Sequence, residues 1–153
     1  MTRCGMRSEP SGSLSATGEV DAVDIVLSHE ALEDITVVLD KDLLRAGADC
    51  ALIVDRAGYV IVNRGDPSNL DIVALAALSA ANYGATEEIA KLIGEQDFSL
   101  LFHKGKNENV HYTKVGDDYF LITLFGKDVS LGLIRMRTAR VRDVLLPILL
   151  GEA

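Results

Sequence analysis

Apolar positions in the first half of the chain follow a helical repeat and then two strand-like runs. Ser28 stands before the repeat and carries the side chain of a good helix N-cap. Gly47 follows it, where a left-handed residue commonly ends a helix. Residues 50–54 and 59–63 are apolar runs of strand length on either side of Asp55-Arg56-Ala57-Gly58, a type I turn pattern, which predicts a hairpin. The helical repeat consists of Leu32, Ile35, Leu39, Leu43 and Ala46.

The second half of the chain carries three more strand-like runs and a last helix. Glycine-containing segments separate these runs, which predicts an antiparallel meander. The last apolar repeat is helical, and Pro147 must end or kink that helix. The predicted strands are 98–103, 110–115 and 119–125, and the predicted helix is 130–150.

Between the hairpin and the meander, residues 70–94 form a helix that is apolar on nearly every side. One stripe is expected to pack on the sheet, and a second side, rich in alanine and glycine, against a partner, because one sheet covers only one side of a helix. An alanine-rich helix buried inside a larger monomer is the alternative. The stripe comprises Ala74, Leu75, Leu78, Ala81, Ala85, Ile89, Leu92 and Ile93, and the second side Ile72, Val73, Ala76, Ala77, Ala80, Tyr83 and Gly84.

The order of elements is therefore α-β-β-α-β-β-β-α, which predicts an α+β sandwich of three layers with a five-stranded antiparallel sheet and helices on both faces. Residues 1–22 are rich in Ser, Gly, Thr and Glu without periodicity, so we expect a disordered tail before a single domain at 23–153.

Composition and charge exclude several classes of function. The net charge of −8 argues against nucleic acid as the main partner, and no apolar run is long enough to span a bilayer. Cys4 and Cys50 make neither a disulfide framework nor a metal site, so a reduced, cytoplasmic protein is expected. The sequence lacks the phosphate-binding loops, nucleophile elbows and metal-binding motifs of common enzymes, which predicts no cofactor, no metal and no catalytic centre.

A few polar side chains remain as candidates for chemistry. If 105–108 is the loop, His103 pairs with Val110 and faces away from His111, whereas a register shifted by one would pair the two histidines. Asn82 lies on the apolar stripe and needs a hydrogen-bond partner if it is buried. The last helix is crowded with arginines, which either contact an acidic partner, phosphate or membrane surface, or form a solvated face with ion pairs. They are Arg135, Arg137, Arg140 and Arg142.

Four blocks of sequence resemble the Roadblock/LC7 domain family, and most closely its MglB-like gliding-polarity regulators. The resemblance runs from about Val26 to about Leu149. It implies a Roadblock (profilin-like) fold, a homodimer built by pairing sheets and central helices, and a Ras-like small GTPase of MglA type as partner. The blocks are ALIVDRAGYVIVNRGD, LAALSAANYGATEEIAKLIGE, the strand ending in His103-Lys104-Gly105, and SLGLIRMR.

The resemblance also implies which residues make these contacts. The GTPase-binding residues are expected on one side of the central helix: Val73, Ala77, Ala80, Gly84, Glu87, Glu88 and Lys91. The dimer contacts are expected at Ile72, Ala76, Ser79, Tyr83, Phe98 and Leu100.

The implied function is regulation of the GTP-bound GTPase, with hydrolysis stimulated by reshaping the GTPase's own active site. Arg56 and Arg64 in turn positions are alternative candidates for an inserted arginine finger. Relatives commonly continue in a C-terminal tail that touches the GTPase, whereas this sequence stops at Ala153, so a non-catalytic scaffold is the main alternative. A small-ligand sensor is a further alternative, although few aromatic residues are available to line a cavity.

Overall fold

The order of helices and strands agrees with the sequence prediction. The computed structural model describes residues 27–65 and 69–151, so the tail expected at 1–22 lies outside the described residues. The elements are α2 (His29–Leu39), which continues as a π-helical turn (Asp40–Leu44), β1 (Ala48–Asp55), β2 (Val60–Gly65), α3 (Ile72–Leu92), β3 (Leu101–Lys104), β4 (Glu108–Val115), β5 (Tyr119–Gly126) and α4 (Leu131–Leu149).

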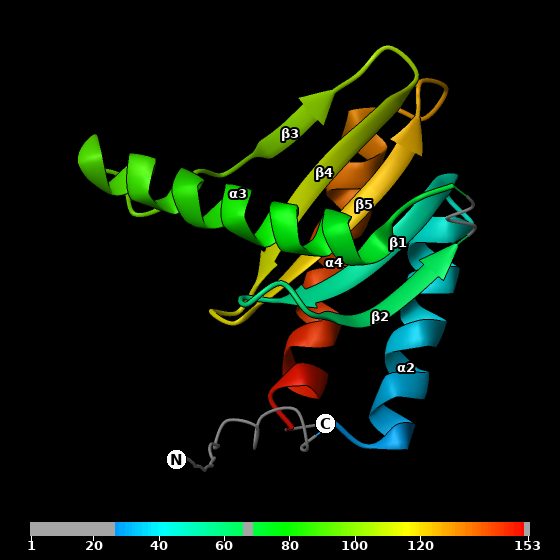
Figure 1. Ribbon diagram of the computed structural model, residues 1–153. Coiled ribbons are helices and arrows are strands. Elements are labelled where there is room, and N and C mark those ends of the chain that lie inside the picture. The colour runs from blue at the N-terminus through cyan, green and yellow to red at the C-terminus, as the bar shows by residue number, and fades with distance from the viewer. Residues whose placement is uncertain (1–26, 66–68, 152–153) are drawn as a thin grey trace, which may run out of the picture.

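The strands form one five-stranded sheet in the order β2-β1-β5-β4-β3, with all neighbours antiparallel. Helix α3 crosses one face of the sheet, and α2 and α4 lie on the other (Figure 1). The expected three-layer α+β sandwich is therefore confirmed. β1 and β5 lie inside the sheet, and both are buried along almost their whole length, as strands covered on both faces must be.

The core between the sheet and helices α2 and α4 contains most of the apolar residues that the helical repeats of the first and last helices predicted to be buried. Ile35, Leu39 and Leu43 are fully buried against the sheet, together with Ile134 and Leu145 of α4. The Ser28 side chain accepts a hydrogen bond from the backbone N–H of Ala31, which confirms the predicted N-cap. Pro147 lies in the last turn of α4, which ends two residues later at Leu149.

The side of α3 that faces the sheet is opposite to the predicted one. The buried residues of this helix are Ala76, Ser79, Ala80, Tyr83 and Ala90. Small side chains let the helix axis approach the sheet, and the Tyr83 ring stacks on Phe120 of β5 with 4.5 Å between ring centroids. The stripe that was expected to face the sheet is instead largely exposed, at Leu78, Ala81, Ala85, Ile89, Leu92 and Ile93.

Strand β3 is shorter than predicted: it begins at Leu101, and residues 98–100 are not part of it. Pairing with β4 begins only at Leu101 and Tyr112. The backbone N–H of Phe98 donates to the side chain of Asp97 at 2.8 Å, a local bond that competes with strand pairing. An edge strand has one neighbour to hold it, so its end is the easiest part of the sheet to lose.

Candidate protein interaction surface

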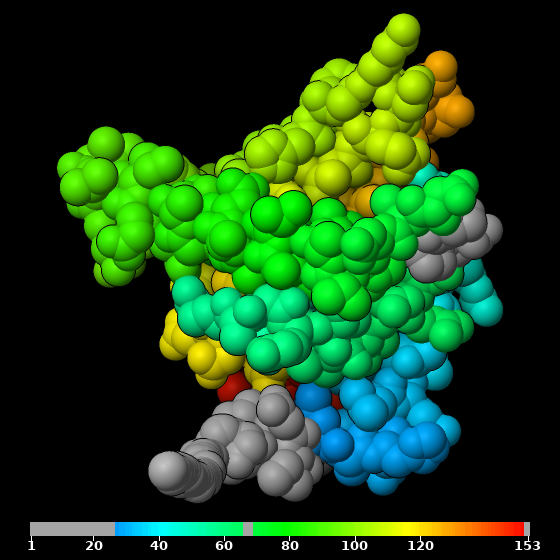
Figure 2. Space-filling view, viewed as in Figure 1, coloured from blue at the N-terminus to red at the C-terminus, as the bar shows by residue number. Residues whose placement is uncertain are grey.

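The outer side of α3 is an exposed apolar surface. Leu78 is 70% exposed and Leu92 is 85% exposed, which is unusual for leucines of a helix that packs on a sheet. Figure 2 shows α3 lying across the front of the molecule, with its C-terminal end projecting beyond the body. A monomer gains nothing by exposing these side chains to water, so this surface is the candidate site for a protein partner.

One flank of α3 faces the edge strand β3. Leu78, Asn82, Ile89 and Ile93 recur at intervals of four and seven residues and therefore share this flank. Asn82 Nδ2 lies 3.0 Å from Nε2 of His103 on β3, so the amide predicted to need a partner finds one on the edge strand. We call these four residues the β3-side flank. It presents three exposed aliphatic side chains, and at Asn82 it meets the sheet edge.

The opposite flank of α3 faces the β1–β2 turn. Val73, Ala77, Gly84, Glu88 and Lys91 share this β2-side flank, again by helical spacing. Gly58 of the turn, at φ +99°, approaches so closely that an added Cβ would lie 3.0 Å from the Cα of Ala77. A Cβ added at Gly84 would meet nothing within 4 Å. The β2-side flank is therefore shallow and open around Gly84.

Several residues assigned to partners from the sequence are instead buried within their own chain. Ala76, Ser79 and Tyr83 lie in the core under α3, and the Ser79 hydroxyl is 3.3 Å from the Tyr112 hydroxyl. Ala80 is also buried there. Their side chains contact the sheet of their own chain and are not available to a partner. The predicted dimer contacts at Ala76, Ser79 and Tyr83, and the predicted GTPase contact at Ala80, are therefore wrong.

The other predicted contact residues lie at or near the surface. Ile72 and Phe98 are half-buried, and Ile72 packs against the core under α3. Leu100 is exposed just before β3. On the β2-side flank, Val73, Ala77, Glu88 and Lys91 are exposed, and their contact with another protein stays a prediction.

Glu87, which was predicted to contact a partner, is held by its own chain. Its carboxylate lies 2.8 Å from a guanidinium nitrogen of Arg56 and 3.1 Å from Nζ of Lys114, and its side chain is only 13% exposed. The hydrogen bond from Arg56 is the main cause that lowers the pKa of Glu87 to about 2, with Lys114 adding to it. This cluster attaches the C-terminal half of α3 to the β1–β2 turn and to β4.

The two arginines considered as fingers are also engaged. Arg56 donates to Glu87 and to the carbonyl of Asp117, and its guanidinium lies 5.5 Å from the Phe120 ring centroid. Arg64 makes two hydrogen bonds of 3.0 Å to Asp40. No local sequence pattern indicated these pairings, because Arg56 and Glu87 are 31 residues apart.

The histidines lie as the first of the two predicted registers requires. His103 pairs with Val110, and His111 faces the α4 side of the sheet while His103 contacts α3. Within residues 27–65 and 69–151, no three His, Cys, Asp or Glu side chains are grouped to hold a metal ion. In the same part of the chain, no helix combines the length and apolar character of a membrane span.

Comparisons with known proteins place this arrangement in a family. The chain is 36% identical to Myxococcus xanthus MglB, with a TM-score of 0.72 over 75% of this chain and 94% of that one. It is 30% identical to the gliding protein MglB from Thermus thermophilus, with a TM-score of 0.74 over 80% and 93% of the two chains. A structure described as MglB with tetrameric arrangement is 28% identical, with a TM-score of 0.77 over 83% and 96%.

The family model of the Roadblock/LC7 domain matches residues 36–125, which run from α2 to Phe125 of β5. This span contains the sheet, apart from the last residue of β5, and the interaction surface on α3. The resemblance seen in the sequence is thus confirmed, and the chain belongs to the Roadblock/LC7 family.

Proposed function

We propose that this protein is a cytoplasmic, homodimeric regulator of a Ras-like small GTPase of MglA type. It binds the GTP form and stimulates hydrolysis by reshaping the active site of the GTPase, without a catalytic centre of its own. The observation that carries the proposal is the exposed apolar outer side of α3, on a chain that is 36% identical to Myxococcus xanthus MglB.

The β3-side flank supports a second copy as the first partner. Leu78, Ile89 and Ile93 are exposed aliphatic residues on the flank that contacts the edge strand through Asn82, and an unpaired strand edge is a ready template for another chain. A specific interface of ordinary size buries roughly 1,600 Å² in total, which needs more surface than one helix flank. The flank, β3 and Leu100 together offer a continuous area for it.

The β2-side flank supports the GTPase as the second partner. It is shallow, because Ala77 and Gly84 carry little or no side chain, and it is bordered by charges at Glu88 and Lys91. Dimerisation through the β3-side flank leaves this surface free. Arg56 in the β1–β2 turn and Arg64, which lies in β2 and not in a turn as expected, are both paired within the chain, which favours activation by reshaping over insertion of either arginine.

The test is to mix the protein with a GTP-loaded MglA-type GTPase and follow complex mass and phosphate release. Gly84→Arg places a long charged side chain on the β2-side flank, where the fold has room for it. We expect the variant to remain dimeric and to lose at least about tenfold in GTPase affinity, as at a central interface position. The matched control is Gly132→Arg on α4, where an added Cβ also meets nothing within 4 Å.

Three results would contradict parts of the proposal. Normal GTPase binding by Gly84→Arg would move the GTPase away from the β2-side flank. Loss of the dimer in that variant would assign the flank to the second copy. Complex formation without faster phosphate release would identify the protein as a scaffold, which is the main alternative.

A further inference from the structure

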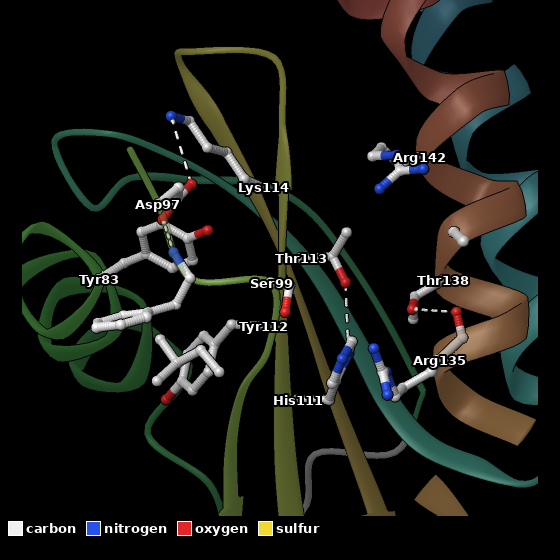
Figure 3. Close-up of a pocket in the computed structure, with 13 residues that line it drawn as sticks. Tyr83, Asp97, Ser99, His111, Tyr112, Thr113, Lys114, Arg135, Thr138 and Arg142 are labelled. Carbon is white, nitrogen blue, oxygen red and sulfur yellow. Dashed lines mark hydrogen bonds and ion pairs between the residues drawn. The ribbon is translucent and has the colours of Figure 1, made fainter. Parts of the chain in front are cut away.

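A pocket lies at the end of β4 that β3 does not cover. Pairing between β3 and β4 stops at Tyr112, whereas β4 continues to Val115. The pocket at this open edge has a volume of about 310 Å³ and reaches towards both helix layers. Figure 3 shows its two sides: Tyr83, Asp97 and Lys114 lie on one, and a group from β4 and α4 lies on the other.

The α4 side of the pocket carries positive charge that no acidic side chain balances from across the pocket. Among the residues that the structure describes, Arg135 has no ion-pair partner. In the same described part of the chain, the one ion pair of Arg142 is with the adjacent Asp143, at 3.2 Å. Asp97, which also lines the pocket, lies near Lys114, 3.9 Å away. Arg135, which lacks an acidic partner on this wall, therefore favours a negatively charged ligand.

A buried histidine completes this side of the pocket. His111 is 5% exposed, and its ring lies beside Arg135 in Figure 3. Its Nδ1 is 3.3 Å from the Thr113 hydroxyl, and within the described residues its Nε2 has no hydrogen-bond partner. If the Thr113 hydroxyl donates to Nδ1, then Nε2 carries the proton and can donate to a ligand. Burial, and then the charge of Arg135, lower the pKa of His111 to about 4, so the ring is neutral at pH 7.

We propose that the pocket binds an oxyanion of phosphate type between Arg135 and His111, with Arg142 further along the same α4 wall of the pocket. A guanidinium offers paired donors that match phosphate oxygens, and the Nε2–H of a neutral imidazole adds one more. The pocket has room for an ion of this size with part of an attached group. This site is on the opposite side of the sheet from α3, and it does not depend on the proposed GTPase partner.

The test uses inorganic phosphate as the probe and the side-chain NMR signals of His111 as the readout. Phosphate is titrated into the full-length protein against chloride of matched ionic strength. We expect a saturable shift of the His111 signals and a rise in the pKa of His111, because a bound anion favours the imidazolium form. Arg135→Ala should weaken phosphate binding by at least about tenfold, the loss expected for a charge-assisted contact.

Arg140→Ala is the matched control, since Arg140 is an exposed arginine of α4 that does not line the pocket. It should leave the phosphate titration unchanged. O-phosphoserine as a second probe separates the two sources of the anion: tighter binding than phosphate identifies a phosphate ester, and equal binding identifies the free ion. Unsaturable shifts, or the same shifts in Arg135→Ala as in the parent protein, would overturn the proposal.

Discussion

Helices α3 and α4 pack on opposite faces of one sheet and use their side chains in opposite ways. α4 buries bulky aliphatic residues, such as Ile134 and Leu145, and turns arginines to the surface. α3 buries mostly alanine and serine, with Tyr83, and exposes Leu78, Ile89 and Leu92. α4 therefore packs bulky aliphatic side chains into the core of its own chain. α3 packs mainly small side chains there, together with Tyr83. The difference supports the proposal that another protein covers the outer side of α3.

The largest difference between the two helices should be the loss of stability when a large side chain is removed. Leu145→Ala empties a fully buried site on α4 and should lower the free energy of unfolding by about 2–5 kcal/mol. Leu78→Ala on the outer side of α3 should change the free energy of unfolding of the monomer by no more than about 0.5 kcal/mol. Urea unfolding at several protein concentrations measures both. Equal losses at low concentration would mean that Leu78 is part of the core.

A charge on the outer side of α3 should break the proposed dimer. Leu78→Glu places a carboxylate in the β3-side flank, and an unpaired charge in an interface costs about 2–5 kcal/mol. Light scattering at micromolar concentration should then give the mass of one chain. Val144→Glu, at an exposed apolar position of α4, is the control and should leave the mass unchanged. A dimer that survives Leu78→Glu would place the interface elsewhere.

Because Glu87 is held by two cations, we expect the contribution of this cluster to the free energy of unfolding to depend on pH. The pKa of Glu87 falls from 4.5 to about 2 on folding, so its stabilising effect is full above pH 4.5 and is lost as the pH falls towards 2. Glu87→Gln should therefore reduce the free energy of unfolding at neutral pH, and the difference should shrink through that window.

The neighbouring variant Glu88→Gln is the control for this experiment. Glu88 is exposed and, among residues 27–65 and 69–151, pairs with Lys91 alone, at 3.0 Å, so its loss should cost less than about 1 kcal/mol at any pH. Unfolding measured from pH 7 to pH 2 gives both curves. A difference between Glu87→Gln and the parent protein that stays constant with pH would show that the cluster does not set the pKa of Glu87.

The smallest expected effect concerns the buried hydroxyl under α3. Ser79→Ala leaves the Tyr112 hydroxyl without the partner that lies 3.3 Å away, and should cost about 1 kcal/mol of unfolding free energy. Adding Tyr112→Phe should recover part of that loss, because both polar partners are then gone. Strict additivity of the two losses in thermal unfolding would contradict a coupled pair.

Local signals in the sequence were sufficient for much of the fold. Ser28 at the start of α2 and the Asp55–Gly58 turn were both predicted correctly, and the pairing of His103 with Val110 is one of the two registers that the sequence left open. Each depends on residues close together in the chain, where backbone geometry and side-chain hydrogen bonds act directly. The Roadblock/LC7 family was likewise recognisable from short blocks in a fixed order.

Which side of α3 faces the sheet was decided only by the tertiary structure. The helix is apolar all round, so its periodicity does not distinguish a side for the sheet from a side for a partner. Close approach to β5 selects the side with small residues and Tyr83, where the ring can stack on Phe120. The ties of Glu87 to Arg56 and Lys114, and the pocket around His111, join residues that are far apart in the chain. Such contacts exist only once the sheet has brought those segments together, so no local pattern encodes them.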